Sequence, residues 1–345
     1  MPAYLFGEQE MKAMFVLVVL LPAVLLAGCV EEQAFGELAE EKAVLFLEKS
    51  QLPSGEFATY ASPKEGMGDS VYNTSPFITS FVAHALSSAN QTGKAGEMKH
   101  RAAEFIKSQK KEGATWNFWG LNEKGLYPEP PDDLDDTSCA AAVLVENGES
   151  IQVDFEEYRA ENGAFFTWFA ERENDIDCVV NANILFFYAL QGKEDSRLCS
   201  YLNEAVESQG YLECTNYYPV SRFAFPYAIS RAFADANASC IEHSLPRLQS
   251  FLLSRQENGV WGNDLDNALA VVSLLNLGFE GEELDKGIRN IKSRQKQDGS
   301  WESQAFFTGP YNCKKTGQCT YFGSAELTTA ISLEAIAKYR KRASS

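Results

Sequence analysis

Five consecutive residues, Asp133-Leu134-Asp135-Asp136-Thr137, carry the side chains best suited to chemistry in this chain. Carboxylates at this spacing repel one another, and the repulsion favours keeping one of them protonated near neutral pH. A neutral carboxylic acid in an apolar cavity can protonate a weak base such as an alkene. The run also precedes an apolar stretch, 139–145, so the same acids would serve equally well as helix caps. Both interpretations stay open on these residues alone.

A second pattern, repeated along the chain, predicts the elements that position this run. An apolar helix-like segment is followed by Gln, then Gly, then an aromatic residue. Good copies begin at residues 51, 109, 256 and 297, and degenerate copies begin at 161 and 209. The last good copy is Gln297-Asp298-Gly299-Ser300-Trp301. Behind each copy we expect a more apolar helix, at 76–87, 137–145, 179–190, 224–234, 268–277 and 327–339.

Six apolar helices alternating with six amphipathic ones predict an all-α fold, a single (α/α)6 toroid with the apolar helices inside. An open solenoid of stacked helix pairs is the competing architecture. The presence of six units favours a closed ring. In such a ring the inner helices all run in the same direction, so their N-termini line one mouth.

The Gln-x-x-Gly-x-Trp units resemble the QW repeats of the squalene–hopene cyclase and protein prenyltransferase β-subunit superfamily. The run 133–137 resembles the DxDDT motif of class II terpene cyclases. This resemblance implies that Asp135 is the proton donor, with Asp133 and Asp136 holding its proton and destabilising its ionised form. It also implies a hydrophobic isoprenoid-like substrate, an isomerase or lyase type of reaction, and no cofactor.

Acids also stand at other predicted helix starts. The pattern Asp-x-Asp occurs at 133–135, 175–177 and 264–266, three corresponding places in the repeat. Ring closure would bring these places to one mouth, where we expect Asp177 and Asp266 to contact substrate. The alternative is that each acid caps only its own helix.

Aromatic and amide side chains supply the remaining candidates for substrate contact. A carbocation needs aromatic faces, and we expect them from Phe165, Trp168, Tyr218 and Tyr227. Asn181 is polar on an otherwise apolar inner helix, so its amide needs a partner if it is buried. Ordinary core packing is the alternative role for each aromatic residue.

The N-terminal segment has the features of a targeting sequence. Met11-Lys12 precedes the apolar run 13–27, and Leu26-Ala27-Gly28-Cys29 resembles a lipobox, whose cysteine is acylated. We therefore expect a signal peptide over 1–29, an acidic tether over 30–41 and the toroid over 42–345. Cys29 would then anchor an extracytoplasmic protein to membrane lipid. A plain signal peptide or a membrane anchor is the alternative, and translation could start at Met1 or Met11.

The net charge of the chain limits its possible binding partners, and the spacing of its cysteines bears on disulfides and metal sites. A formal net charge of −18 argues against nucleic acid. Seven cysteines follow Cys29, so one is left over from any set of pairs. We expect a disulfide between Cys313 and Cys319, and some pairing among Cys199, Cys214 and Cys240. The sequence has no CxxC or HxxxH spacing, so we expect no metal site.

Two other classes of function fit an acidic toroid. Paired carboxylates and aromatic rings suit a glycan hydrolase or lyase. A non-catalytic lipoprotein that binds a lipid, a peptide or a protein in its mouth is the other, with calcium among the Asp-x-Asp runs as a variant. Class II cyclases of full length hold the acid between two domains, whereas this chain has room for one. We therefore expect loops at 117–131 and 304–321 to close the mouth.

Overall fold

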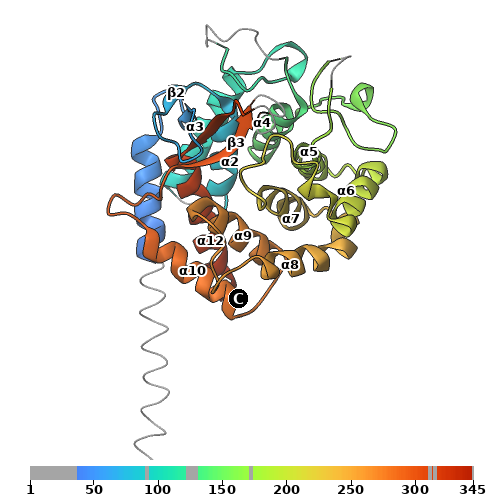
Figure 1. Ribbon diagram of the computed structural model, residues 1–345. Coiled ribbons are helices and arrows are strands. Elements are labelled where there is room, and N and C mark those ends of the chain that lie inside the picture. The colour runs from blue at the N-terminus through green and yellow to red at the C-terminus, as the bar shows by residue number, and fades with distance from the viewer. Residues whose placement is uncertain are drawn as a thin grey trace, which may run out of the picture.

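Six buried helices form a closed ring at the centre of the molecule. The computed structural model describes residues 37–89, 93–121, 131–170, 174–309, 313 and 317–343. Each inner helix packs against the next, and the last returns to the first. Figure 1 shows this ring. Its members are α2 (Pro76–Leu86), α4 (Leu134–Glu146), α5 (Cys178–Leu190), α7 (Ala224–Ala236), α9 (Asp264–Asn276) and α12 (Ala325–Ala343). The predicted all-α toroid is confirmed.

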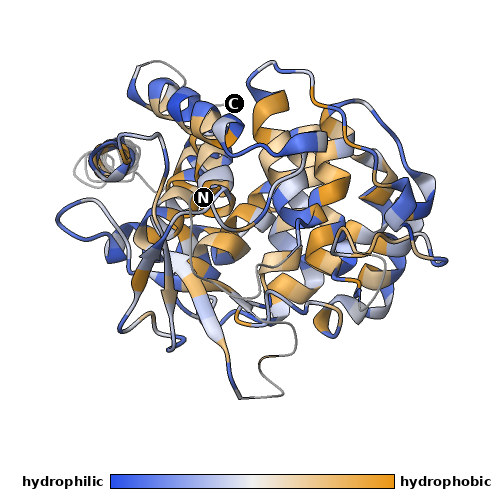
Figure 2. Ribbon diagram, turned by 90° about the horizontal axis from the view of Figure 1, so that it is seen from above, coloured by the Kyte–Doolittle hydropathy of each residue, from blue (hydrophilic) through white to orange (hydrophobic). Residues whose placement is uncertain are grey.

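The inner helices are apolar because they are covered on every side. All residues of α2 are buried, and α5 exposes none of its first eleven residues. A helix that is apolar all round needs such an environment. Figure 2 shows apolar residues concentrated on the central helices and hydrophilic ones toward the outside. No helix in the described part of the chain is long and apolar enough to cross a membrane.

The outer ring consists of amphipathic helices, and among the described residues it has one helix fewer than expected. It consists of residues 37–50, α3 (Lys94–Ser108), α6 (Ser196–Ser208), α8 (Leu245–Ser254) and α10 (Glu282–Arg294). Between α4 and α5 the described residues contain only the 3-10 turn η2 (Glu156–Tyr158). Further 3-10 turns are η1 (Glu112–Ala114), η3 (Gly210–Leu212) and η4 (Ser239–Ser244). Among the described residues the outer ring thus has five α-helices, against the six expected.

The first outer helix includes residues of the expected tether. Residues 37–50 are helical, and Ala39, Ala43 and Leu47 place a buried stripe against the toroid. Gln295 Nε2 donates to Ala39 O at 2.9 Å, and Arg340 pairs with Glu40 at 2.6 Å. Residues 37–41 therefore belong to the toroid, and the predicted signal peptide lies outside the described residues.

A repeated latch explains why each unit carries its aromatic residue. The indole N–H groups of Trp116, Trp261 and Trp301 donate at 2.7–2.8 Å to carbonyls of the preceding outer helix. In five units the backbone N–H of the repeat aromatic donates to a Thr or Asn near the start of the inner helix. These acceptors are Thr79, Thr137, Asn181, Asn267 and Thr329. The aromatic residue thus joins the outer helix of its unit to the inner one.

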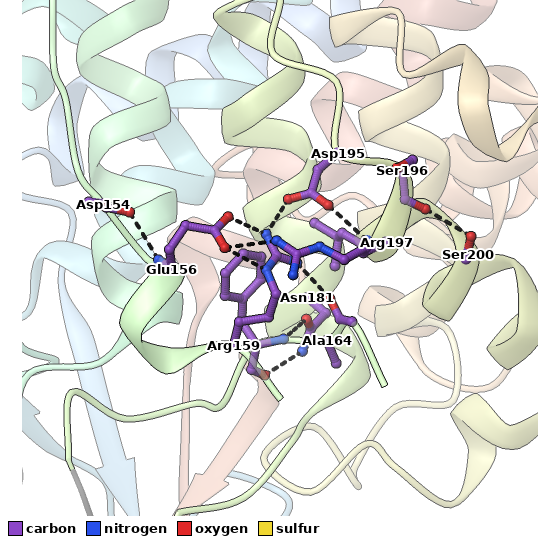
Figure 3. A network of polar contacts seen from close by, with 12 residues as sticks. Asp154, Glu156, Arg159, Ala164, Asn181, Asp195, Ser196, Arg197 and Ser200 are labelled. Carbon is purple, nitrogen blue, oxygen red and sulfur yellow. Dashed lines mark hydrogen bonds and ion pairs between the residues drawn. The ribbon is translucent and has the colours of Figure 1, made fainter. Parts of the chain in front are cut away.

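The repeat glutamine is not at the same place in every unit. Gln51 Nε2 donates to Gly55 O at 2.8 Å, and Gln295 makes the same bond to Gly299 O at 3.0 Å. Gln295, and not the expected Gln297, is therefore the equivalent residue in the last unit. In the third unit Arg159 Nη1 donates to Gly163 O at 2.7 Å, and Figure 3 shows this arginine with its acidic partners Glu156 and Asp195.

Glycine is required at the repeat position by both conformation and space. Gly55 and Gly299 have φ of 94°, a region that favours glycine. A Cβ on Gly55 would lie 2.1 Å from Arg101 O, and one on Gly299 would lie 2.2 Å from Lys42 O. The second contact joins the last unit to the first, so this glycine helps to close the ring.

A small antiparallel sheet, which the sequence did not lead us to expect, covers one side of the mouth. Its strands are β1 (Thr59–Ser62), β2 (Val71–Asn73), β3 (Gln304–Gly309) and β4 (Thr320–Ser324), in the order β2-β1-β4-β3. β1 and β4 come from the first and last units, so the sheet also bridges the ring closure. Thr308 N donates to Tyr217 O at 2.8 Å, which places β3 over the mouth.

Three disulfides are present among the described residues. Cys313 pairs with Cys319 as expected, and Cys199 pairs with Cys240. Cys214 pairs with Cys178, a partner that we did not anticipate. Cys139 is the unpaired thiol and is buried.

Candidate active site at the mouth of the toroid

The acidic run forms the first turn of α4, not the loop before it. The helix begins at Leu134, three residues earlier than expected, and Asp133 is its N-cap. The Asp133 carboxylate accepts from Asp136 N at 2.7 Å. Thr137 is one of the repeat latches described above. The capping interpretation therefore holds for Asp133, while Asp135 has different partners.

Asp135 is held by side chains from two other parts of the ring. Its Oδ1 accepts from Asn183 Nδ2 at 2.7 Å, and its Oδ2 accepts from the Tyr218 hydroxyl at 2.5 Å. Behind them, Arg231 Nη2 donates to Asn183 Oδ1 at 2.7 Å. Cys139 Sγ lies 4.0 Å from Asp135 Oδ1. The carboxyl group is thus fixed in position by α5, α7 and the loop that carries Tyr218.

The environment of the run favours neutral carboxyl groups. Burial raises the pKa of Asp135, against hydrogen bonds from Tyr218 and Asn183 that favour the charged form. Burial also raises the pKa of Asp133 to about 7. The pKa of Asp136 is raised well above its usual range by burial and by repulsion from Asp133. Burial is thus the main cause of the raised pKa of Asp135.

Aromatic rings surround the Tyr218 side of the acid. The Tyr218 ring centroid lies 5.2 Å from that of Phe306 and 6.4 Å from those of Phe77 and Phe307. Phe118 and Phe322 extend this group through Phe307, at 4.9 Å each. Except for Tyr218, these residues were not among the predicted candidates. The Phe-Phe pair in the expected closing loop, 304–321, is the sequence signal that could have identified them.

The other predicted site residues are more dispersed. Asp177 caps α5, where it accepts from Val179 N and Tyr217 N, and burial raises its pKa to about 7. Asp266 lies at the start of α9 and accepts from Ser221 Oγ at 2.5 Å. Trp168 Nε1 donates to the Tyr217 hydroxyl at 2.9 Å. All three lie at the mouth. The charge of Asp135 adds to the rise in the pKa of Asp177, but no described hydrogen bond joins any of the three side chains to Asp135.

Three further candidates lie away from the acid. The Asn181 side chain forms two hydrogen bonds with the Phe165 backbone, which is the repeat latch of this unit. Figure 3 shows the position of Asn181. Tyr227 is fully buried and donates to Glu334 at 3.0 Å. Their contact with substrate stays a prediction, whereas Asn183, which we had not selected, touches Asp135 directly.

A cluster of charged side chains closes the opposite end of the ring. His84, Asp235 and Glu334 have donor atoms within 4.8 Å of one another, a spacing that could hold a metal ion. However, the Lys338 ammonium lies 2.7 Å from Asp235 and 3.0 Å from Glu334. Because a cation already bridges the two carboxylates, the cluster fits an ion network better than a metal centre.

Comparisons with known proteins agree with the repeat and the acidic run. A family model, the sesquiterpene cyclase astC-like C-terminal domain, matches residues 98–191. This segment includes Asp135 and Asn183. Drimenol cyclase drtB from Aspergillus calidoustus is 23% identical over 223 residues, covering 62% of this chain and 41% of its own length. The type II terpene cyclase MstE from Scytonema, solved with geranylgeranyl dihydroxybenzoate, superposes with a TM-score of 0.70 at 17% identity.

The chain therefore resembles terpene cyclases in part of its sequence, and a type II terpene cyclase in its fold. The superposition covers 90% of this chain and 99% of MstE, so a single toroid accounts for nearly all of that cyclase chain. An unsaturated glucuronyl hydrolase specific for heparin also superposes, with a TM-score of 0.56 at 10% identity, covering 90% of this chain and 98% of its own. The match to drimenol cyclase spans less than half of that protein.

Proposed function

We propose that this protein is a class II terpene cyclase in which Asp135 protonates an alkene of a polyprenoid lipid. The observation that carries the proposal is a buried carboxyl group, fixed by Tyr218 and Asn183, beside a group of aromatic rings. The raised pKa of Asp135 favours the protonated form that an acid catalyst needs.

The reaction begins when the Asp135 O–H bond breaks and its proton forms a C–H bond with the alkene. The remaining carbon becomes a carbocation, which neighbouring double bonds of the polyprenoid attack in turn. The faces of Tyr218, Phe306 and Phe307 stabilise positive charge on the way. Loss of a proton or addition of water ends the reaction.

We infer further that the substrate carries no phosphate. Helix N-termini can bind phosphate through free N–H groups, but five of the six inner helices use a side chain there as acceptor. These caps are Ser75, Asp133, Asp177, Asn263 and Ser324. Asp175, Asp266 and Glu326 add further acids at the mouth, and burial raises the pKa of each. Such a mouth suits a neutral lipid better than an anion.

The glycan hypothesis has less support. It requires two carboxyl groups that flank an open groove, whereas Asp135 is only 8% exposed and its Oδ2 is bonded to the Tyr218 hydroxyl. The likeness to a glucuronyl hydrolase is a likeness of fold alone. We also propose that Cys29, which lies outside the described residues, is acylated and holds the enzyme at a membrane that supplies the lipid.

The decisive experiment uses the chain from residue 30 onward and a panel of polyprenyl substrates. Cyclised products are measured by mass spectrometry for the wild type, Asp135→Asn and the exposed control Asp154→Asn. We expect product from the wild type and the control, and a loss of about 10²-fold or more in Asp135→Asn. Circular dichroism checks that each variant is folded. Equal product from Asp135→Asn would exclude the acid role, and no product from the folded wild type would favour a non-catalytic lipid-binding protein.

A further inference from the structure

Each turnover of the proposed reaction leaves Asp135 without its proton, so a proton has to return to a buried carboxyl group. The mouth side of Asp135 is taken up by Tyr218 and the aromatic rings, and would hold an apolar substrate. Water is excluded from such a surface. The structure offers a second route, on the opposite side of Asp135, through the interior of the ring.

A small cavity lies between Asp135 and the charged end of the ring. It is lined at one end by Cys139 and Arg231, and at the other by His84 and Glu146. Cys139 is one helical turn from Asp135 along α4, and Glu146 is about 16 Å along the same axis. The cavity has about 10 Å³ of room, which is close to that needed by one water molecule.

Polar atoms around this cavity have unused hydrogen-bonding capacity. Within the described residues, Arg231 Nε and Glu146 Oε2 are buried and have no hydrogen-bond partner. Arg231 is 3% exposed, and its guanidinium lies 4.4 Å from the Phe186 ring centroid. Buried polar atoms usually find a protein or water partner. The two atoms therefore indicate a water site in the cavity.

The far end of the cavity leads toward solvent through His84. Its Nδ1 lies 2.8 Å from Glu146 Oε1, and its Nε2 lies 3.5 Å from Asp235 Oδ2. Side-chain exposure rises along this path, from 5% at His84 to 12% at Glu146 and 26% at Asp235. Arg231 also faces His84 from α7, and Lys338 and Glu334 complete the network from α12.

The charge on His84 suits it to supply a proton. Burial lowers the pKa of His84, but Glu146 and Asp235 outweigh this effect and raise the pKa to about 9. The imidazole is therefore protonated at neutral pH. Burial, with the Asp135 charge, raises the pKa of Cys139 well above its usual range, so its thiol keeps its proton between transfers.

We propose that the cavity carries the proton that recharges Asp135, from His84 through Glu146, one water molecule and the Cys139 thiol. This inference rests on the proposed function. The His84 Nδ1–H bond breaks as its proton bonds to the Glu146 carboxylate, which lies 2.8 Å away, and the Glu146 carboxyl group passes a proton to the water. The water passes a proton to Cys139 Sγ, and the Cys139 S–H proton bonds to Asp135 Oδ1. The net change is neutral His84 and protonated Asp135. His84 then regains a proton from solvent beside Asp235.

The test measures proton exchange at Asp135 directly, without substrate. Transfer of the protein to D2O shifts the infrared C=O band of a protonated carboxyl group, and Asp135→Asn assigns the band. We expect exchange about 10²-fold slower in Cys139→Ala than in the wild type. Cys139→Ser, which restores a group that can pass a proton, should recover most of the rate. His84→Gln should also slow exchange, with its thermal unfolding measured alongside.

The outcomes separate this inference from the proposed function. Equal exchange rates in wild type and Cys139→Ala overturn the relay, whatever the activity. Slow exchange in both Cys139→Ala and Cys139→Ser shows a packing effect and also overturns it. If the wild type has no band that depends on Asp135, the residue is ionised, and the proposed function fails together with the relay. Where product forms, Cys139→Ala should keep a first turnover at the wild-type rate and lose the later ones.

Discussion

At the scale of single residues, Tyr218 sets how easily Asp135 gives up its proton. The Tyr218 hydroxyl donates to the carboxyl group at 2.5 Å, a bond that lowers the pKa of Asp135 against the effect of burial. An acid catalyst is active while protonated, so activity falls as the pH rises through that pKa. Tyr218→Phe removes the hydrogen bond that stabilises ionised Asp135, so the pKa of Asp135 rises. We therefore expect the fall in kcat/KM at alkaline pH to occur about one pH unit higher than in the wild type.

The matched control for this change is Tyr211→Phe. Tyr211 is also buried, and its hydroxyl has no hydrogen-bond partner among the described residues. We expect this variant to leave the pH profile unchanged. If the alkaline fall in kcat/KM of Tyr218→Phe stays at the wild-type pH or moves to lower pH, the hydroxyl does not stabilise ionised Asp135.

At the scale of helices and turns, two disulfides close long loops around the third and fourth units. Cys178–Cys214 and Cys199–Cys240 span 36 and 41 residues, whereas Cys313–Cys319 spans 6. Chain entropy predicts that losing a long-loop pair lowers the free energy of unfolding by about 4 kcal/mol, against about 2 kcal/mol for the short one. Urea unfolding of Cys199→Ala/Cys240→Ala and Cys313→Ala/Cys319→Ala tests the order. An equal or reversed order would contradict the entropic explanation.

The sequence carries most of the information on the ring and less on the site. The apolar inner helices and the repeated Gly-x-Trp turns predict the toroid. The structure adds the reason for the repeat, because the backbone N–H of the aromatic residue donates to a Thr or Asn of the inner helix. Element boundaries were less predictable, since α4 and α9 begin within their acidic runs, at Leu134 and Asp264. The acid itself follows from the run 133–137. Its partners Asn183 and Tyr218 lie 48 and 83 residues away, and only ring closure brings them together.

At the scale of the whole molecule, the distribution of charge argues for a lipid without phosphate. Side-chain caps at five of the six inner helices occupy N–H groups that would otherwise be free to bind an anion. The net charge of −18 repels a diphosphate further. We therefore expect geranylgeraniol to bind the mouth at least about 10-fold more tightly than geranylgeranyl diphosphate, a difference of about 1.4 kcal/mol.

This preference is measured on the Asp135→Asn variant, which binds without turning over, by titrating tryptophan fluorescence with each lipid in matched detergent. Added Mg²⁺ and salt are varied because either would screen the diphosphate. The alcohol should bind independently of salt, and the diphosphate should gain affinity as salt rises. Tighter binding of the diphosphate at low salt without Mg²⁺ would mean that a cationic group at the mouth, such as the exposed Arg222 near Asp266, binds the anion, and the substrate would then belong to the diphosphate class.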